Sequence, residues 1–213
     1  MKKYALIGKD IQDSLSPVIH NGWGCQYDSL DVEKCQLQWA LSQPYDGFNV
    51  TAPYKEEIIP YLNKLQLAAE EIRAVNVVKK VNGQLHGFNS DVFGFVYSIT
   101  IDNKLNLDNV GILGDGGAAK AVKWILKGIN KKFKQIDSYN YKTNDFQELT
   151  GLVNCTPKQD YDLTGLPKSA WIMDLGYKDS TLINEARKQG HFAINGFGML
   201  YRQAEESQRI WNI

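Results

Sequence analysis

The stretch Asn109-Val110-Gly111-Ile112-Leu113-Gly114-Asp115-Gly116-Gly117-Ala118 decides how this chain folds. Its aliphatic start predicts a strand over 109–113, its glycines predict a tight turn over 114–117, and 118–127 is rich in strong helix formers. Glycines between a strand and a helix let backbone amides approach a pyrophosphate at the helix N-terminus. The stretch is typical of a dinucleotide-binding βα unit. A simple tight connection is the alternative, and the glycine spacing departs from the usual three-glycine pattern.

Downstream of this stretch, strands alternate with helices. Strands are expected over 135–139, 152–154, 171–175 and 192–194, with a helix over 180–189 between the last two. Such alternation implies a parallel sheet. The last expected helix, 197–211, has an amphipathic stripe of Leu200, Ala204, Ser207 and Trp211, which can pack back on the first domain.

Upstream, the pattern predicts a smaller α/β region. A strand over 4–7 is followed by a helix from 16 to 23, with Ser16 as its N-cap and Pro17 at its first position. A weak helix over 35–43, a strand over 48–50 and a helix over 55–65 come next. Strands over 74–80 and 84–88 flank Asn82-Gly83, a strong hairpin signal, and a helix over 91–101 leads out of the region.

These elements predict an α/β protein of two α/β domains. Residues 1–92 together with 197–213 form a small N-terminal domain completed by the C-terminal helix, and residues 93–196 form a Rossmann-like dinucleotide-binding domain. The active site is expected in the cleft between the domains, where sheets of this kind place their ligands.

Composition narrows the class of ligand. The 24 Lys and Arg residues balance the 24 Asp and Glu residues, so no net charge favours nucleic acid or an anionic membrane. The apolar N-terminal stretch is too short for a signal peptide or a spanning helix, and the protein is expected in the cytoplasm. The scattered cysteines and histidines predict neither a disulfide framework nor a metal site. A small molecule is the expected partner.

Four further strings surround the glycine turn. They are Ser14-Leu15-Ser16-Pro17 with His20-Asn21; Asn49-Val50-Thr51 with Pro53 and Lys55; Ala74-Val75-Asn76 leading to Gly87-Phe88-Asn89-Ser90-Asp91; and Asn195-Gly196 with Met199-Leu200 and Gln203. In this order the strings resemble the shikimate dehydrogenase family, over residues 5–211. The resemblance implies reversible, NADP-dependent interconversion of 3-dehydroshikimate and shikimate, a step in the biosynthesis of chorismate and the aromatic amino acids.

The resemblance also implies the roles of individual residues. Lys55 and Asp91 match the catalytic lysine and aspartate, with Lys55 favoured as the proton carrier. From the residues alone, Lys55 could instead be an ordinary exposed lysine, and Asp91 could be only the N-cap of a helix. The substrate-binding positions of the family fall on Ser14, Ser16, Asn49, Thr51, Asn76, Tyr177 and Gln203. Hydroxyls near a helix N-terminus suit a carboxylate, although Ser16 as a cap and Ser14 as a turn residue are the alternative.

The cofactor implied is NADP. The residues expected to bind it are Gly114, Asp115, Gly116, Gly117, Ala118, Lys120, Asn140, Lys142 and Gly196. The family commonly has arginine in the string that reads Asn140-Tyr141-Lys142 here, so Lys142 and Lys120 are the expected cations for the 2′-phosphate. Asp137 lies near the spacing of an NAD-binding carboxylate, but the predicted strand runs past it to 139, which argues against that role.

Two other functions stay open. One is a quinate/shikimate dehydrogenase that uses NAD, although Ser14 and Ser16 favour shikimate. The other is a non-catalytic dinucleotide-binding sensor module, which would need neither Lys55 nor Asp91. The chain is also shorter than is usual for the family, mostly between Asn21 and Asn49, and it is expected to be a monomer or a homodimer.

Overall fold

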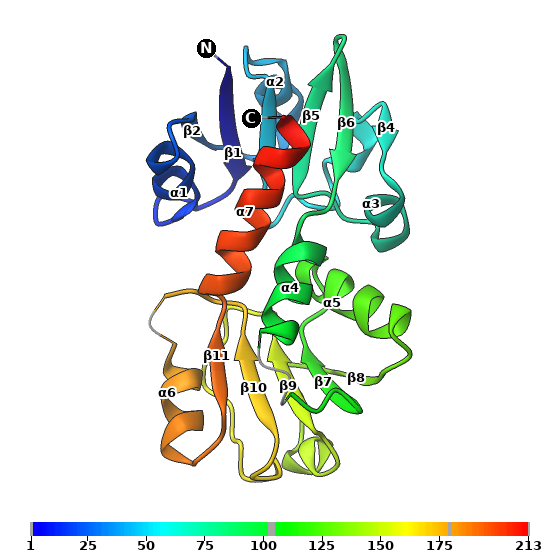
Figure 1. The fold of residues 1–213 in the computed structure, drawn as a ribbon, viewed down its shortest axis with the longest axis vertical. Helices are drawn as coiled ribbons and strands as arrows, with labels where there is room; N and C mark the ends of the chain where they lie inside the picture. Colours follow the sequence, from blue (N-terminus) through cyan, green and yellow to red (C-terminus); the bar gives the residue numbers. More distant parts are fainter. Residues whose placement is uncertain (1, 102–104, 179, 213) are drawn as a thin grey trace. The chain divides into compact units, whose positions relative to one another are not determined.

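The computed structural model of the 213-residue chain describes residues 2–101, 105–178 and 180–212. The chain divides into two compact units, each built on one β-sheet (Figure 1). Unit 1 comprises 1–93 and 201–213, and unit 2 comprises 94–200.

Unit 1 contains a six-stranded sheet of order β2-β1-β3-β5-β6-β4. Strand β1 (Lys3–Gly8) pairs in parallel with β2 (Gln26–Asp31) and β3 (Gly47–Val50), whereas β5 (Val77–Val81) is antiparallel to β3 and β6 (Gln84–Phe88). The short β4 (Lys64–Leu65) pairs with β6. Its helices are α1 (Ser16–Gly22), η1 (Lys34–Gln36), α2 (Leu37–Ser42), η2 (Ile59–Tyr61) and α3 (Leu67–Ile72).

Both faces of this sheet are covered. Alternate residues of β1 point to opposite faces, so Ala5 and Ile7 pack with α2, whereas Tyr4 and Leu6 pack with Trp211 of α7 (Phe197–Trp211). A strand that is buried on both faces is expected to have a continuous apolar sequence, as β1 has. The strand over 4–7 could be predicted for that reason. Asn82 and Gly83 have φ of 51° and 79°, which confirms the predicted hairpin turn.

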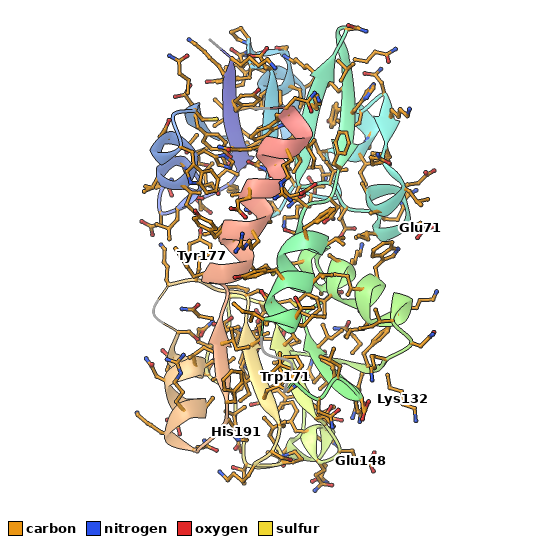
Figure 2. The ribbon with its side chains drawn as sticks, in the orientation of Figure 1. Glu71, Lys132, Glu148, Trp171, Tyr177 and His191 are labelled. Atoms are coloured by element: carbon orange, nitrogen blue, oxygen red, sulfur yellow. The ribbon has the colours of Figure 1, made fainter. Side chains whose placement is uncertain are left out.

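Unit 2 contains a five-stranded parallel sheet of order β11-β10-β9-β7-β8. Its strands are β7 (Asn109–Leu113), β8 (Lys132–Ile136), β9 (Gly151–Asn154), β10 (Trp171–Asp174) and β11 (Ala193–Asn195). Helices α5 (Gly117–Gly128) and α6 (Thr181–Lys188), the short η3 (Thr143–Phe146) and most of α4 (Asp91–Thr100) complete it. The indole of Trp171, labelled on β10 in Figure 2, is buried and donates to the carbonyl of Asn106 at 2.8 Å.

The strand, glycine turn and helix over 109–128 confirm the opening prediction. Gly114 has φ of +92°, a conformation that favours glycine, and a Cβ there would lie 2.6 Å from the methyl group of Thr156. The α/β fold with two sheets is likewise as the sequence predicts.

Two local predictions are wrong, and three elements were missed. Residues 55–65 do not form one helix, because Pro60 lacks an amide and its ring blocks helix continuation; the chain makes turns, η2 and β4 instead. Ser16 is not an N-cap: α1 begins at Ser16 itself, after Leu15, without a side-chain cap. Strands β2 and β4 and helix α3 have no clear apolar period and were not predicted.

A further difference bears on the cofactor. Strand β8 runs from Lys132 to Ile136 and not over 135–139, with Ile136 paired to Leu113 of β7. Only Ile136 of this strand is buried, so its sequence carries almost no apolar signal. Asp137 therefore follows the strand directly, and the expectation that it lies too early to be the strand-end residue is wrong.

Candidate active site

Lys55 and Asp91 form an ion pair in unit 1. The Lys55 ammonium lies 2.6 Å from Oδ2 of Asp91, and the side chains are 18% and 6% exposed. A lone exposed lysine, the alternative considered above, would not be held this way. The pair is close enough for direct proton exchange with a hydroxyl placed beside it.

The chain fixes both partners through their backbones. The carbonyl of Lys55 accepts from the amide of Val75 at 2.7 Å, next to Asn76. Asp91 is the first residue of α4, and its amide donates to Oδ1 of Asn89 at 3.1 Å. Both carboxylate oxygens of Asp91 accept from other side chains, Lys55 and Asn76, and not from amides of its own helix.

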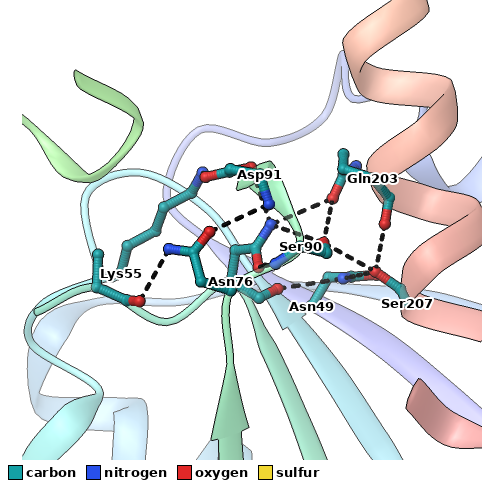
Figure 3. Close-up of polar contacts among 9 residues, drawn as sticks. Asn49, Lys55, Asn76, Ser90, Asp91, Gln203 and Ser207 are labelled. Carbon is teal, nitrogen blue, oxygen red and sulfur yellow. Dashed lines mark hydrogen bonds and ion pairs between the residues drawn. The ribbon is translucent and has the colours of Figure 1, made fainter. Parts of the chain in front are cut away.

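Asn76 is the hub of a buried network that Figure 3 shows. Its Nδ2 donates to Oδ1 of Asp91 at 2.9 Å and to Oε1 of Gln203 at 3.3 Å, and it also lies 3.0 Å from Oγ of Ser90. Its Oδ1 accepts from the amide of Ser90 at 2.6 Å. Asn76 therefore orients the oxygen of Asp91 that faces away from Lys55, and links it to α7 through Gln203.

A second layer of the network joins Asn49, which the sequence analysis assigned to the substrate, to Tyr27, Ser90 and Ser207, which it did not assign to the site. Asn49 accepts from the Tyr27 hydroxyl at 2.7 Å, and its Nδ2 donates to the carbonyl of Asn76 at 3.1 Å and to Oγ of Ser207 at 2.9 Å. Ser90 and Ser207 are fully buried. For Ser207 the available signal was its place four residues after Gln203 on an amphipathic helix, because a polar residue in an apolar stripe needs a partner.

The remaining predicted substrate residues of unit 1 are not hydrogen-bonded to this network. Ser14 lies just before α1 and Ser16 is the first residue of α1, and Oγ of Ser14 accepts from the amide of Ser16 at 3.2 Å. Thr51 directly follows β3, and its amide donates to the carbonyl of Ile7 at 2.9 Å, at the end of β1. These residues all follow the carboxyl ends of parallel strands, the edge at which α/β sheets bind ligands.

In unit 2, the glycine turn suits a pyrophosphate. The N-terminal residues of α5 are Gly117 and Ala118, and the N-cap position is Gly116, which has no side chain to occupy the first helical amides. A Cβ on Gly116 would meet nothing within 4 Å, so the approach to those amides is open. Asp115 lies within the turn and Lys120 follows in the first turn of α5.

The expected 2′-phosphate cations differ in their surroundings. Lys142 is exposed, and its backbone amide donates to Oδ2 of Asp145 at 2.8 Å. The side chain of Asn140 donates to Oδ2 of Asp137 at 2.9 Å. That bond, with the backbone amides of Tyr139 and Asn140, lowers the pKa of the Asp137 carboxyl below its usual value.

Tyr177 and Gly196 lie at the carboxyl ends of neighbouring strands. Tyr177 is half-buried, in the segment after β10 (Figure 2). Gly196 follows β11, and its amide donates to the carbonyl of Gly176 at 2.8 Å. A Cβ on Gly196 would overlap the carbonyl oxygen of Leu175, so this position needs glycine for packing, whatever it contributes to cofactor binding.

The buried side chain of His20, in α1, should make the stability of unit 1 depend on pH. Its ring is fully buried, stacks on Tyr27 with centroids 4.3 Å apart, and has no hydrogen-bond partner for either nitrogen among the described residues. Burial lowers its pKa from 6.5 to about 4. The unfolded chain binds this proton first, so stability should fall as the pH drops from about 6.5 toward 4.

We expect protonation of this histidine to lower the free energy of unfolding by about 3 kcal/mol between pH 6.5 and pH 4. Urea unfolding of the wild type and of His20→Phe between pH 7 and pH 4 measures it. The aromatic variant should show a flatter pH dependence. Equal slopes for the two proteins would show that other groups cause the acid sensitivity.

Comparison with known proteins identifies the family. Residues 6–78 match the family model described as the shikimate dehydrogenase substrate binding domain. The shikimate dehydrogenase (NADP(+)) of Clostridium botulinum is 33% identical, over 97% of this chain and 95% of the relative. The chain belongs to the shikimate dehydrogenase family.

Solved structures of shikimate dehydrogenases have the same fold. The enzyme of Aquifex aeolicus superimposes with a TM-score of 0.86 at 28% identity, over 100% of this chain and 92% of that one. The Thermus thermophilus enzyme, solved in complex with NADP(H) and shikimate, gives 0.88 at 25% identity, over 99% and 93%. The resemblance deduced from the sequence strings is therefore confirmed.

Two further properties concern only the described part of this shikimate dehydrogenase family member. None of its helices is long and apolar enough to cross a membrane. Residues 2–101, 105–178 and 180–212 contain no group of three or more His, Cys, Asp or Glu residues that could hold a metal ion.

Proposed function

We propose that this protein catalyses the reversible oxidation of shikimate to 3-dehydroshikimate with NADP, in the biosynthesis of chorismate and the aromatic amino acids. The observation that carries the proposal is the Lys55–Asp91 pair, held 2.6 Å apart and oriented by Asn76. The relatives support it, because those reported above are named shikimate dehydrogenase (NADP(+)) or were solved with NADP(H) and shikimate.

The reaction requires one proton and one hydride to leave the same alcohol group. Nicotinamide, when bound, accepts the hydride from the carbon. Lys55 accepts the hydroxyl proton during oxidation and returns it to the carbonyl oxygen during reduction. Asp91 positions the amine through Oδ2, and Asn76 prevents the carboxylate from rotating by holding Oδ1. Catalysis by this chain's own residues is thus proton transfer and positioning.

Substrate binding is assigned to polar side chains of unit 1. Ser14 and Ser16 hold the carboxylate, and Thr51, Asn76 and Gln203 bind the ring hydroxyls. Asn49 is assigned to the ring hydroxyls as well, as the resemblance implies. Its Nδ2 donates to the carbonyl of Asn76 and to Oγ of Ser207, so it also positions these two residues.

The domain assignment follows from these roles. Residues 1–92 with 197–213 form the substrate domain, and 93–196 form the NADP domain, in which the glycine turn binds the pyrophosphate and Tyr177 serves the nicotinamide end. We further propose that the protein acts in the cytoplasm as a monomer or homodimer, since both substrate and cofactor are small and polar.

Initial rates with the purified protein test this function. Absorbance of reduced nicotinamide is followed with shikimate or quinate as substrate and with NADP or NAD as cofactor. The proposal expects the largest kcat/KM for the pair shikimate and NADP. Asp137 at the end of β8 favours the competing possibility, NAD, and a clear preference for NAD would replace NADP in the proposal. No turnover with any pair would favour a sensor module.

The carboxylate site is tested by Ser14→Ala and Ser16→Ala. Each change removes a donor that binds the anion equally in the ground and transition states, so we expect KM for shikimate to rise by roughly tenfold with a smaller change in kcat. Steady-state kinetics at saturating NADP measures both constants. If neither variant changes KM, the substrate carboxylate is bound by other residues.

A further inference from the structure

Lys158 lies at the centre of an aromatic group in unit 2. Its ammonium is 5.4 Å from the ring centroid of Tyr139, 5.5 Å from that of Tyr141 and 5.2 Å from that of Tyr161. It also donates to the carbonyl oxygen of Ser138 at 3.1 Å. Three ring faces and one carbonyl fix the position of a side chain that is otherwise flexible.

The position of Lys158 relates it to the dinucleotide. Lys158 is in the loop that follows β9, and Thr156 of the same loop is in contact range of any Cβ at Gly114, in the phosphate turn. Ser138 lies two residues beyond Ile136, the last residue of β8. In dinucleotide-binding sheets the pyrophosphate occupies the first glycine turn, and the adenosine ribose lies at the end of the second strand. The ammonium of Lys158 is thus held beside the ribose end.

Asp137 would oppose a 2′-phosphate at this end unless its charge were compensated. Its Oδ1 accepts from the amides of Tyr139 and Asn140 at 2.8 and 3.2 Å, and its Oδ2 accepts from Nδ2 of Asn140 at 2.9 Å. The carboxylate is therefore engaged in the turn and is not presented to a ribose diol. The pKa of this carboxyl is lowered mainly by the Asn140 side chain and by the amides of Tyr139 and Asn140, with a smaller contribution from the charge of Lys158.

The position at which the family commonly has arginine cannot supply the cation here. Tyr141 stacks on Phe146 with centroids 5.1 Å apart, and its hydroxyl accepts from the amide of Asp162 at 2.7 Å. This tyrosine belongs to the packing of unit 2. Lys158 Nζ carries three hydrogens. Among the described residues it donates to the Ser138 carbonyl and otherwise contacts ring faces, so a phosphate oxygen would be a stronger acceptor for its remaining hydrogens.

We propose that Lys158 is the residue that selects NADP, by binding the 2′-phosphate in place of the missing arginine. The inference rests on the proposed use of NADP, and it replaces Lys142 as the principal phosphate cation. The three tyrosines limit the ammonium to one place, so that less side-chain entropy is lost on binding than for the exposed Lys142.

The test uses two probes that differ only in the 2′-phosphate, adenosine 2′,5′-bisphosphate and adenosine 5′-monophosphate. Calorimetry measures their affinity for the full chain and for Lys158→Met, Lys158→Arg and Lys142→Met. We expect Lys158→Met to weaken bisphosphate binding roughly tenfold or more, with monophosphate binding changed less than twofold. Lys158→Arg should retain the preference, because arginine also binds phosphate and stacks on aromatic rings.

Lys132→Met is the matched control, since Lys132 is exposed at the opposite end of β8 (Figure 2). It should bind both probes as the wild type does. Equal losses for both probes in Lys158→Met would mean that Lys158 only supports the turn, and would overturn the inference. Loss of the preference in Lys142→Met alone would also overturn it. If the wild type prefers the bisphosphate, Lys158→Met loses that preference and the wild type does not oxidise shikimate, the assignment of Lys158 stands and the proposed function is rejected.

Discussion

Lys55→Met is expected to lower kcat for shikimate oxidation by roughly two to four orders of magnitude while dinucleotide affinity stays unchanged. Methionine has nearly the length of lysine but cannot exchange a proton. It also removes the ion pair with Asp91, which leaves the carboxylate with Asn76 as its side-chain partner. The effect should fall on the chemical step, because the glycine turn proposed to bind the cofactor is in unit 2.

Steady-state kinetics and calorimetry with NADP measure the two quantities. Lys34→Met is a suitable control, because the Lys34 side chain is 72% exposed and forms an ion pair with Glu57 rather than with Asp91. Circular dichroism checks that each variant is folded. Near-normal turnover in a folded Lys55→Met protein would reject Lys55 as the proton carrier.

Trp211→Ala is expected to destabilise unit 1 by about 3–5 kcal/mol. The indole is 1% exposed, stacks on Tyr4 with centroids 4.3 Å apart, and donates from Nε1 to the carbonyl of Val78 at 3.0 Å. Its removal leaves a cavity between α7 and the sheet and removes the hydrogen bond to the Val78 carbonyl. Because α7 also carries Gln203 and Ser207, the site should lose order along with the helix.

Urea unfolding followed by far-ultraviolet circular dichroism measures this loss. Trp39→Ala is the matched control, because Trp39 is 52% exposed on α2 and should cost much less. Equal, small losses for both variants would mean that α7 does not anchor on the sheet through Trp211.

The sequence predicted the elements that carry a strong local signal. Strand β7, helix α5 and the Asn82-Gly83 turn have consistent apolar periods or turn residues, and the structure has them where they were expected. Strand β8 was predicted to start three residues too late, because a strand with one buried residue has no periodic pattern of apolar residues. Because of that error, Asp137 was predicted to lie before the end of the strand, whereas it directly follows the strand.

In the site, too, the residues in clear sequence motifs were predicted and the others were missed. Lys55, Asn76, Asp91 and Gln203 stand in strings typical of the family, and the structure brings them into one hydrogen-bonded network. Ser90 and Ser207 were missed as members, because a buried serine in a helix or before one has many structural roles. Lys158 was missed because its aromatic surroundings come from residues 139, 141 and 161, which meet only in three dimensions.

A crystal structure of the full chain with shikimate tests the central claim most directly. The account predicts that the reacting hydroxyl lies within hydrogen-bond distance of Lys55 Nζ and the Asp91 carboxylate, with the substrate carboxylate against Ser14 and Ser16. Shikimate bound with a hydroxyl away from Lys55, or bound elsewhere in the chain, would contradict it.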